Sequence, residues 1–149
     1  TRLNAHLLRT ILRDVAHKQV VKNPNEKISF SEHVLIAAGW RPGQSTDHVA
    51  VLLANNFKAK TVINISNVSY VYDKNPSKYK NAKPIKSINW IDFRKMVGNK
   101  WSPGLNTPFD PIAANAAQKS RLKVAIMGKD LKNMNAYLNN KEFRGTLVF

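Results

Sequence analysis

The sequence predicts an α/β protein in which helices cover both faces of a mostly parallel sheet. Strand-length apolar runs occur at residues 33–38, 61–65 and 122–127, and segments with helix signals lie between and after them. Alternating strands and helices produce parallel βαβ units, whose sheets are buried on both faces. No internal repeat or linker divides the 149 residues, so we expect residues 1–149 to form a single domain. Ligands bind such sheets at the carboxyl ends of strands, which directs attention to the loops after the three runs.

The first forty residues predict a helix followed by two strands. Apolar residues recur at helical spacing from the start of the chain: Leu3, Leu7, Leu8, Ile11, Leu12 and Val15. A short strand is predicted at 19–22, and the apolar run 33–38 predicts a buried strand that ends at Gly39. The first residue is Thr, and the amphipathic helix has no element before it to pack on. We therefore expect this sequence to be the back part of a longer protein.

Residue types preferred at helix N-caps mark the helices of the remaining chain. These residues are Ser45, Asn89, Asp110 and Asp130. Asp110 is followed by Pro111, which suits the first turn of a helix. β-branched and apolar residues predict strands at 61–65, 122–127 and 145–149, whereas the stretch 72–84 is polar and contains two prolines.

Charge and composition restrict the classes of function. Lysine and arginine number 24 against 9 acidic residues, and the formal net charge of +15 favours anionic partners, either nucleic acid or nucleotides. The basic residues are scattered, which is also typical of a solvated surface. The absence of cysteine excludes disulfides and thiolate metal sites and permits the cytoplasmic location that we expect. No apolar run approaches the roughly 20 residues of a membrane helix, so we expect no membrane partner.

Common catalytic and metal-binding patterns are not visible in the sequence. The histidines have no metal-ligand spacing and receive no role in metal binding or catalysis: His6, His17, His33 and His48. Neither a Ser/His/Asp set nor a pair of carboxylates stands out. The catalytic residues are therefore unknown at this stage.

The loop at residues 39–47, between a predicted strand and a predicted helix, is the first candidate site. Its glycines allow a ligand to approach the backbone, and the helix N-terminus offers free N–H groups. Ser45 and Thr46 add hydroxyl groups and Arg41 adds positive charge, which suits a phosphate or a ribose. The Gly-Lys-Ser/Thr ending of a P-loop is absent. An ordinary turn with a Ser cap explains the same residues, so both interpretations stay open.

Two later loops are weaker candidates. The stretch 66–76 contains tyrosines that could stack on a base and Asn and Ser side chains that could bind a ribose or phosphate. A polar loop with buried tyrosines is the simpler interpretation. In the stretch 104–111, Asp110 is explained as an N-cap, so we prefer the structural interpretation there.

Several of these segments match the signatures of one family, in the same order. Residues 37–50 (AAGWRPGQSTDHVA) are similar to Gly-Gly-x-x-Pro-Gly-x-Thr/Ser-Thr-Asp-x-x-Ala, and residues 67–76 (NVSYVYDKNP) to Asn-Val-Asp-Gly-Val-Tyr-x-x-Asp-Pro. Segments 1–5, 109–114 and 143–146 also fit. The combination resembles the archaeal-type UMP kinases of the amino acid kinase family over essentially the whole chain.

The resemblance implies a fold, a reaction and two binding sites. The fold is the three-layer αβα sandwich of amino acid and carbamate kinases, the assembly is a homo-hexamer, and the reaction transfers phosphate from ATP to UMP with Mg²⁺ in pyrimidine biosynthesis. By position, the UMP site comprises Trp40, Arg41, Pro42, Gly43, Gln44, Ser45 and Thr46. The ATP site comprises Ser66, Asn67, Tyr72 and Asn75. No residue of this chain is assigned to a metal, and nucleic acid is the less favoured partner.

The sequence departs from the family pattern in two respects. Ser69 and Tyr70 replace Asp-Gly, and Asn75 replaces Asp, so this loop loses two carboxylates that could contact ribose or magnesium. The family's Gly-Gly-Ser phosphate loop and Gly-Gly-Gly segment are absent from these residues. We therefore expect a nucleotide-binding C-terminal part of the domain, truncated at the N-terminus and inactive alone, with the catalytic residues in the N-terminal half.

Two alternatives stay open. One is another kinase of the same fold acting on an amino acid, carbamate or isoprenoid phosphate, which the Pro-Gly-x-Ser-Thr-Asp loop at 42–47 disfavours. The other is a non-catalytic nucleotide-binding relative with a storage or regulatory role, which is compatible with the lost carboxylates.

Overall fold

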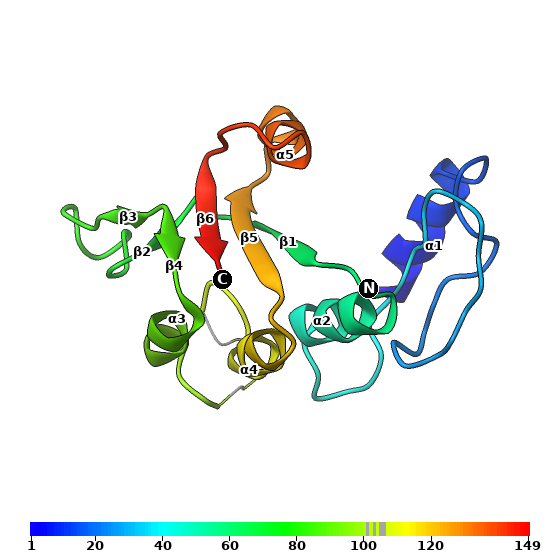
Figure 1. Cartoon of the computed structure of the whole chain (residues 1–149), viewed down its shortest axis with the longest axis horizontal. Coiled ribbons are helices and arrows are strands. Elements are labelled where there is room, and N and C mark those ends of the chain that lie inside the picture. Colours follow the sequence, from blue (N-terminus) through cyan, green and yellow to red (C-terminus); the bar gives the residue numbers. More distant parts are fainter. Residues whose placement is uncertain (101, 103, 105–106) are drawn as a thin grey trace.

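A four-stranded mixed sheet forms the centre of the protein (Figure 1). The computed structural model describes residues 1–100, 102, 104 and 107–149. The strands lie in the order β1 (Thr61–Ser66), β5 (Lys123–Gly128), β6 (Gly145–Val148) and β4 (Ser87–Ile88). β1 is parallel to β5 and β4 to β6, whereas β6 runs antiparallel to β5. Parallel pairing predominates in the described sheet, which confirms the predicted fold class.

Three helices pack together against one face of this sheet. They are α2 (Thr46–Asn56), α3 (Trp90–Val97) and α4 (Pro111–Lys119). Their buried side chains join a hydrophobic cluster with the strand residues Val62, Val124, Ile126 and Val148. α5 (Leu131–Leu138) follows β5, and α1 (Arg2–Ile11) lies apart from the sheet, beyond α2 (Figure 1). The main core therefore lies between the sheet and α2, α3 and α4.

The four predicted N-caps are confirmed and explain where these helices begin. Side-chain oxygens of the caps accept backbone N–H groups in the first turns of α2, α3, α4 and α5: Ser45, Asn89, Asp110 and Asp130. Asp110 Oδ1 accepts from two of them, at 2.6 Å from the Ile112 nitrogen and 2.8 Å from the Ala113 nitrogen. These bonds satisfy donors that a helix N-terminus otherwise leaves unpaired.

The predicted strands at 19–22 and 33–38 are extended segments and not regular strands. Residues 16–21 and 34–37 meet in two isolated bridges: Ala16, which lies before the first predicted strand, pairs with Val34, and Val21 pairs with Ala37. Four backbone hydrogen bonds of 2.8 to 3.1 Å join them, but a bend at residues 18–19 separates the two points of contact. Because the ladder is interrupted there, the pairing never becomes a continuous strand. The first helix is also shorter than predicted, because α1 ends at Ile11 and Val15 lies in the turn that follows.

A short hairpin closes the polar stretch in which no strand was predicted. β2 (Val71–Tyr72) pairs antiparallel with β3 (Pro84–Ile85), and the two form a separate two-stranded sheet. The loop between them is tied at its base, because Asp73 Oδ1 accepts the backbone N–H of Lys83 at 2.7 Å. The hairpin therefore presents the second candidate loop on an ordered base.

A second, smaller hydrophobic cluster lies under α1. It contains Ala5, Ala16, Val20, Ile36 and Ala38. The long apolar side chains of α1 take little part in it, since Leu7 is 62% exposed and Ile11 is 67% exposed. The two extended segments thus cover only the small side chains of α1.

Candidate functional site

The loop that leads into α2 has a backbone shaped by glycine and by the cap of the helix. Gly43 has a φ of 80°, a conformation that residues with a side chain rarely adopt. Ser45 Oγ then accepts the His48 N–H at 3.1 Å and starts the helix. Both interpretations of this loop are therefore compatible with the geometry, because a helix cap and a ligand-facing helix N-terminus occur together here.

Two arginines bring positive charge to the start of the same loop. The Arg41 guanidinium lies over the Trp40 ring, 4.1 Å from its centroid, which is a cation–π contact. Arg2 Nη2 donates to the Trp40 carbonyl at 3.2 Å and links α1 to the loop. Arg41 is exposed, so its charge is available to an anion. The Trp40 ring thus holds the Arg41 side chain. Trp40, which was predicted to lie beside the nucleotide, therefore has a contact with another predicted site residue.

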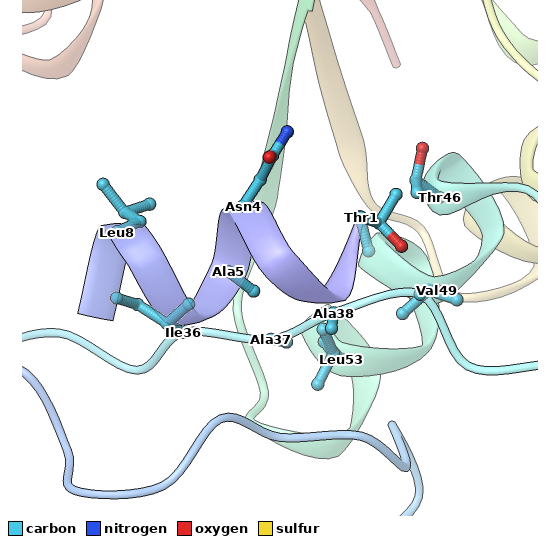
Figure 2. Close-up of a pocket in the computed structure, with 12 residues that line it drawn as sticks. Thr1, Asn4, Ala5, Leu8, Ile36, Ala37, Ala38, Thr46, Val49 and Leu53 are labelled. Carbon is cyan, nitrogen blue, oxygen red and sulfur yellow. The ribbon is translucent and has the colours of Figure 1, made fainter. Parts of the chain in front are cut away.

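A cavity of about 350 Å³ opens between α1 and α2 (Figure 2). Its walls come from both helices and from the extended segment before the loop, and they include Asn4, Leu8, Ile36, Ala38, Thr46, Val49 and Leu53. Figure 2 shows the Asn4 amide and the Thr46 hydroxyl pointing toward the same side, away from Ala37, Ala38 and Leu53. Gly39 also lines it, and a Cβ there would lie 2.7 Å from Thr1 Oγ1. The cavity is mostly apolar, so on its own it suits no phosphate.

A smaller cavity of about 140 Å³ joins the loop to the N-terminus of α4. It is lined by Gly43, Gln44, Ser45, His48, Asp110 and Ile112. Within the described part of the chain, the buried Gln44 Oε1 has no hydrogen-bond partner. A buried acceptor without a partner costs free energy, and a ligand donor would satisfy it. Gln44 is thus a residue of this loop whose buried side-chain oxygen could accept a hydrogen bond from a ligand.

Two aspartates connect this loop to the sheet and to α4. Asp47 Oδ2 accepts the backbone N–H of Asp110 at 3.0 Å, and Asp47 Oδ1 lies 3.5 Å from Asn64 Nδ2. Burial raises the pKa of Asp47, the Asp110 N–H lowers it, and the nearby Asp110 carboxylate raises it further. The N-cap role predicted for Asp110 is present, but its contact with Asp47 was not predicted. Asp110 caps α4 and Asp47 lies in the first turn of α2, so both lie at helix N-termini, which is the one sequence signal that they share.

The second candidate loop begins at the carboxyl end of β1. Ser66 is the last residue of β1 and lies opposite Gly128 of β5, so the ends of two strands meet here. Ser66 Oγ lies 3.5 Å from the Val68 nitrogen. The loop also packs on β5, since a Cβ on Gly128 would lie 3.2 Å from Ser69 Oγ. Ser66 and Asn67 thus lie at the sheet edge where parallel sheets bind ligands.

The remaining residues of this loop are partly occupied by structural contacts. Tyr72 is half-buried in β2, with its ring edge-to-face to Tyr70 at a centroid distance of 6.5 Å. Asn75 Oδ1 accepts the Ser77 N–H at 2.9 Å and forms a turn of its own. The Asn75 side chain therefore shapes the loop, and because it is exposed, its amide nitrogen and the second lone pair of its oxygen can still face a ligand.

Both candidate loops adjoin the same end of β1. The contact between Asp47 and Asn64 puts the start of α2 beside β1 two residues before Ser66. The N-terminus of α4 joins them through Asp110. Two helix N-termini and the end of β1 thus converge, and helix N-termini favour anions. In the described residues, His, Asp and Glu do not gather in any group of three that could hold a metal.

Comparisons with known proteins give the family of this chain. A sequence model of the Amino acid kinase family matches residues 2–128. A protein named uridylate kinase from Sulfurisphaera tokodaii is 36% identical over 143 residues, which cover 93% of this chain and 62% of the relative. One from Methanobrevibacter smithii is 34% identical over 152 residues, which cover 99% and 67%. The chain therefore spans only part of the length of these curated relatives.

Solved structures are similar over the same region. The uridylate kinase structure from Archaeoglobus fulgidus matches with a TM-score of 0.85 and 29% identity, over 100% of this chain and 68% of that one. The UMP kinase structure from Bacillus anthracis matches at 0.62 with 21% identity, over 76% of this chain and 45% of that one, and shares the fold. With the family match across most of its length, this chain belongs to the amino acid kinase family.

Proposed function

We propose that the protein is a UMP kinase, which transfers the γ-phosphate of ATP to UMP and releases UDP and ADP. The observation that carries the proposal is the convergence of the two predicted nucleotide loops at the end of β1, through the contacts of Asp47 with Asn64 and Asp110. Relatives named uridylate kinase, 36% and 34% identical to this chain, support the same reaction.

In this proposal the acceptor UMP lies against the loop from Trp40 to Thr46. Arg41 and the N-terminal N–H groups of α2 attract the phosphate, and Ser45 and Thr46 bring hydroxyl groups to it. Gln44 Oε1, which lacks a partner in the described structure, accepts a hydrogen bond from a donor group of the nucleotide. The chemistry requires positioning and charge neutralisation more than bond-making groups from the protein.

The donor ATP is proposed to lie against the loop that starts at Ser66 and Asn67. Tyr72 offers a ring edge for packing and Asn75 an amide nitrogen. Mg²⁺ would neutralise phosphate charge in this family, but the residues here fit direct ligation poorly. Asp47 is held by the Asp110 N–H and Asp110 by its own cap bonds. Magnesium usually keeps waters and phosphate oxygens as ligands, so we assign it to no residue of this chain.

We extend the proposal to cytoplasmic location and to the homo-hexameric assembly that the resemblance implies. No helix among the described residues is long and apolar enough to cross a membrane. The Gly-Gly-Ser phosphate loop of the family is absent from residues 1–149. We therefore expect these residues alone to form UDP at least about a thousandfold more slowly than the full-length protein, because phosphoryl transfer needs donors on all sides of the moving group.

The test is UDP formation by the full-length protein with ATP, Mg²⁺ and each of UMP, CMP, AMP and GMP. We expect UMP to be selected, and comparable rates with AMP would contradict the proposal. Thr46→Ala should raise the KM for UMP more than that for ATP, and Tyr72→Ala should do the reverse. Thr10→Ala on the exposed face of α1 and Tyr137→Ala in α5, where Tyr137 is half-buried and edge-to-face to Phe143, remove the same groups outside both loops and serve as matched controls.

A non-catalytic nucleotide-binding relative is the second candidate. One observation favours it: Asn75 stands where the family has a carboxylate and its side chain shapes a turn, so this position offers a ligand no negative charge. Equilibrium titration separates the two functions. ATP and UMP binding to the full-length protein without UDP formation would favour the second candidate, and turnover would exclude it.

A further inference from the structure

A buried threonine of β6 holds the hairpin that carries the second loop. Thr146 is fully buried, and its hydroxyl accepts the Val71 N–H at 2.8 Å and donates to the Ile85 carbonyl at 2.5 Å. Val71 and Ile85 are partners in β2 and β3. One hydroxyl therefore connects both strands of the hairpin to the central sheet.

The hairpin needs this support because its own pairing is slight. Each strand has two residues, and Pro84 lacks the N–H with which other residues join a ladder. Isolated two-stranded hairpins are marginally stable at best. Val71 is buried in the main core, whereas Tyr72 is its immediate neighbour in the loop. A shift at Val71 would therefore move Tyr72 directly.

The threonine itself is held firmly on the other side. A Cβ on Gly145 would lie 2.7 Å from the Ile126 carbonyl, so β6 approaches β5 closely at the residue before Thr146. The Asn133 side chain of α5 holds Arg144 through two bonds, donating to its carbonyl at 2.8 Å and accepting its N–H at 2.6 Å. These contacts join the backbone of β6 immediately before Thr146 to β5 and α5.

We propose that Thr146 is a positioning residue for ATP, whose hydroxyl fixes the place of Val71 and through it the ring of Tyr72. The proposal rests on the proposed function, in which Tyr72 contacts ATP. The effect should be selective for ATP over UMP. The Thr146 hydroxyl bonds to Val71 and Ile85 of the hairpin, and neither residue belongs to the loop before α2 that is proposed to bind UMP. Burial alone would not require a hydroxyl here, since valine has the same shape.

The experiment compares three variants of the full-length protein. Thr146→Val removes the hydroxyl and keeps the volume, and Thr146→Ser keeps the hydroxyl. Val148→Ala opens a cavity two residues further along the same strand, where Val148 pairs with Ile88 of β4 and Val124 of β5 and not with β2 or β3. We expect Thr146→Val to raise the KM for ATP on the order of tenfold and the KM for UMP less than about twofold. Thr146→Ser should stay within about threefold of the wild type for ATP, and Val148→Ala should lower stability without this selectivity.

A second measurement reports on the anchor without any catalysis. In hydrogen exchange, Thr146→Val should speed exchange at the Val71 amide and across 71–85 while the amides of α4 keep their protection. A double variant tests the route, because Thr146→Val should add little to the ATP KM once Tyr72→Ala is present. If Thr146→Val fails to fold, Thr146→Cys decides the same question at smaller amplitude, because a thiol is a weaker donor and acceptor than the hydroxyl it replaces.

The results separate the two ideas. Equal changes in both KM values, or an unchanged KM for ATP in Thr146→Val, would overturn the positioning role. A wild type that neither binds ATP nor forms UDP would show that the proposed function is wrong, and the ATP part of this inference would fall with it. Unchanged exchange at Val71 would overturn the anchor independently of function.

Discussion

Helices with apolar faces are buried to different extents in the sheet-centred region and in the N-terminal region. In α4, Ala113, Ala114 and Ala117 are fully buried against the main cluster. In α1, Leu3 is 86% exposed and Ile11 is 67% exposed, although the periodicity of the sequence is clear. Amphipathic periodicity forms a helix in both regions, but most helix stability in proteins comes from packing of the apolar face. The sheet supplies that packing partner for α4, whereas the one buried side chain of α1 is the small Ala5.

The largest expected effect is a cavity in the sheet-centred region. Phe93 is fully buried, and its ring lies edge-to-face to that of Trp90 at 5.9 Å. Phe93→Ala should lower the free energy of unfolding by about 3–5 kcal/mol. Ile11→Ala in α1 should change it by about 0.5 kcal/mol or less, because the side chain is already in water. Urea titration followed by far-UV circular dichroism measures both, and similar losses would show that the two regions do not differ in packing.

A buried cap should matter more than an exposed cap of the same chemistry. Asp110 is 4% exposed, caps α4 through two bonds and belongs to the contact with Asp47, whereas Asp130 caps α5 on an exposed surface. Asp110→Ala should lower the free energy of unfolding by about 2 kcal/mol, and Asp130→Ala by about 0.5–1 kcal/mol. The same urea titration tests this. A larger loss for Asp130 would mean that the site end of α4 contributes little to stability.

The sequence predicted elements well where local signals decide them. The caps at Ser45 and Asp110 and the strand at 61–65 depend on residue type and spacing, which are visible in the chain. The prediction of a strand at 33–38 was wrong, because a strand needs a continuous partner. The neighbouring segment at 16–21 pairs with it only at two points, and the bend at 18–19 separates them. Apolar content predicts burial and extension, but not whether a ladder forms.

The site shows the same division between local and distant information. Loop 39–47 could be singled out from its residues, and its sites for UMP stay a prediction. The contact of Asp47 with Asp110 joins residues 63 positions apart, and the bond of Thr146 to Val71 spans 75 positions. None of these residue types is unusual at its position, so one sequence offers no signal that the pairs form. The pairs depend on the order of the strands in the sheet, which is determined by packing between distant segments.

A smaller effect should appear in the pH dependence of stability at Asp47. Because burial raises its pKa in the folded protein above the ordinary value, the folded form binds the proton more tightly than the unfolded form. The contribution of Asp47 to the free energy of unfolding therefore decreases as pH rises from about 3.8 through the raised pKa. Asp47→Asn keeps an oxygen for the Asp110 N–H and should remove this dependence.

The measurement is the free energy of unfolding of wild type and Asp47→Asn between about pH 4 and pH 7. At pH 7 the variant should be as stable as the wild type or more stable, by about 1 kcal/mol or less. Glu32 provides a contrast in the N-terminal region, because hydrogen bonds from the backbone and His17 lower its pKa, so Glu32→Gln should change the slope in the opposite sense. Parallel pH curves for wild type and Asp47→Asn would contradict the assignment.

The smallest effect on stability should come from the exposed face of α1, where we expect a change in association instead. The side chains of this face are Leu3, Leu7, Leu8 and Ile11. Contiguous apolar surface of this kind commonly mediates contacts between proteins, so residues 1–149 should self-associate through it. The double variant Leu7→Gln with Ile11→Gln should leave the free energy of unfolding within about 0.5 kcal/mol, because both side chains are already solvated.

Sedimentation velocity over a range of concentrations distinguishes this face from apolar exposure in general. The matched control is Leu131→Gln with Leu138→Gln, since these leucines of α5 are 76% and 60% exposed and belong to the sheet-centred region. The α1 pair should shift the protein toward monomer and the α5 pair should not, because α1 exposes four large apolar side chains on its surface and α5 exposes two. If only the α5 pair abolished association, the apolar surface that mediates it would lie on α5 and not on α1. The proposed difference between the two regions would then be wrong.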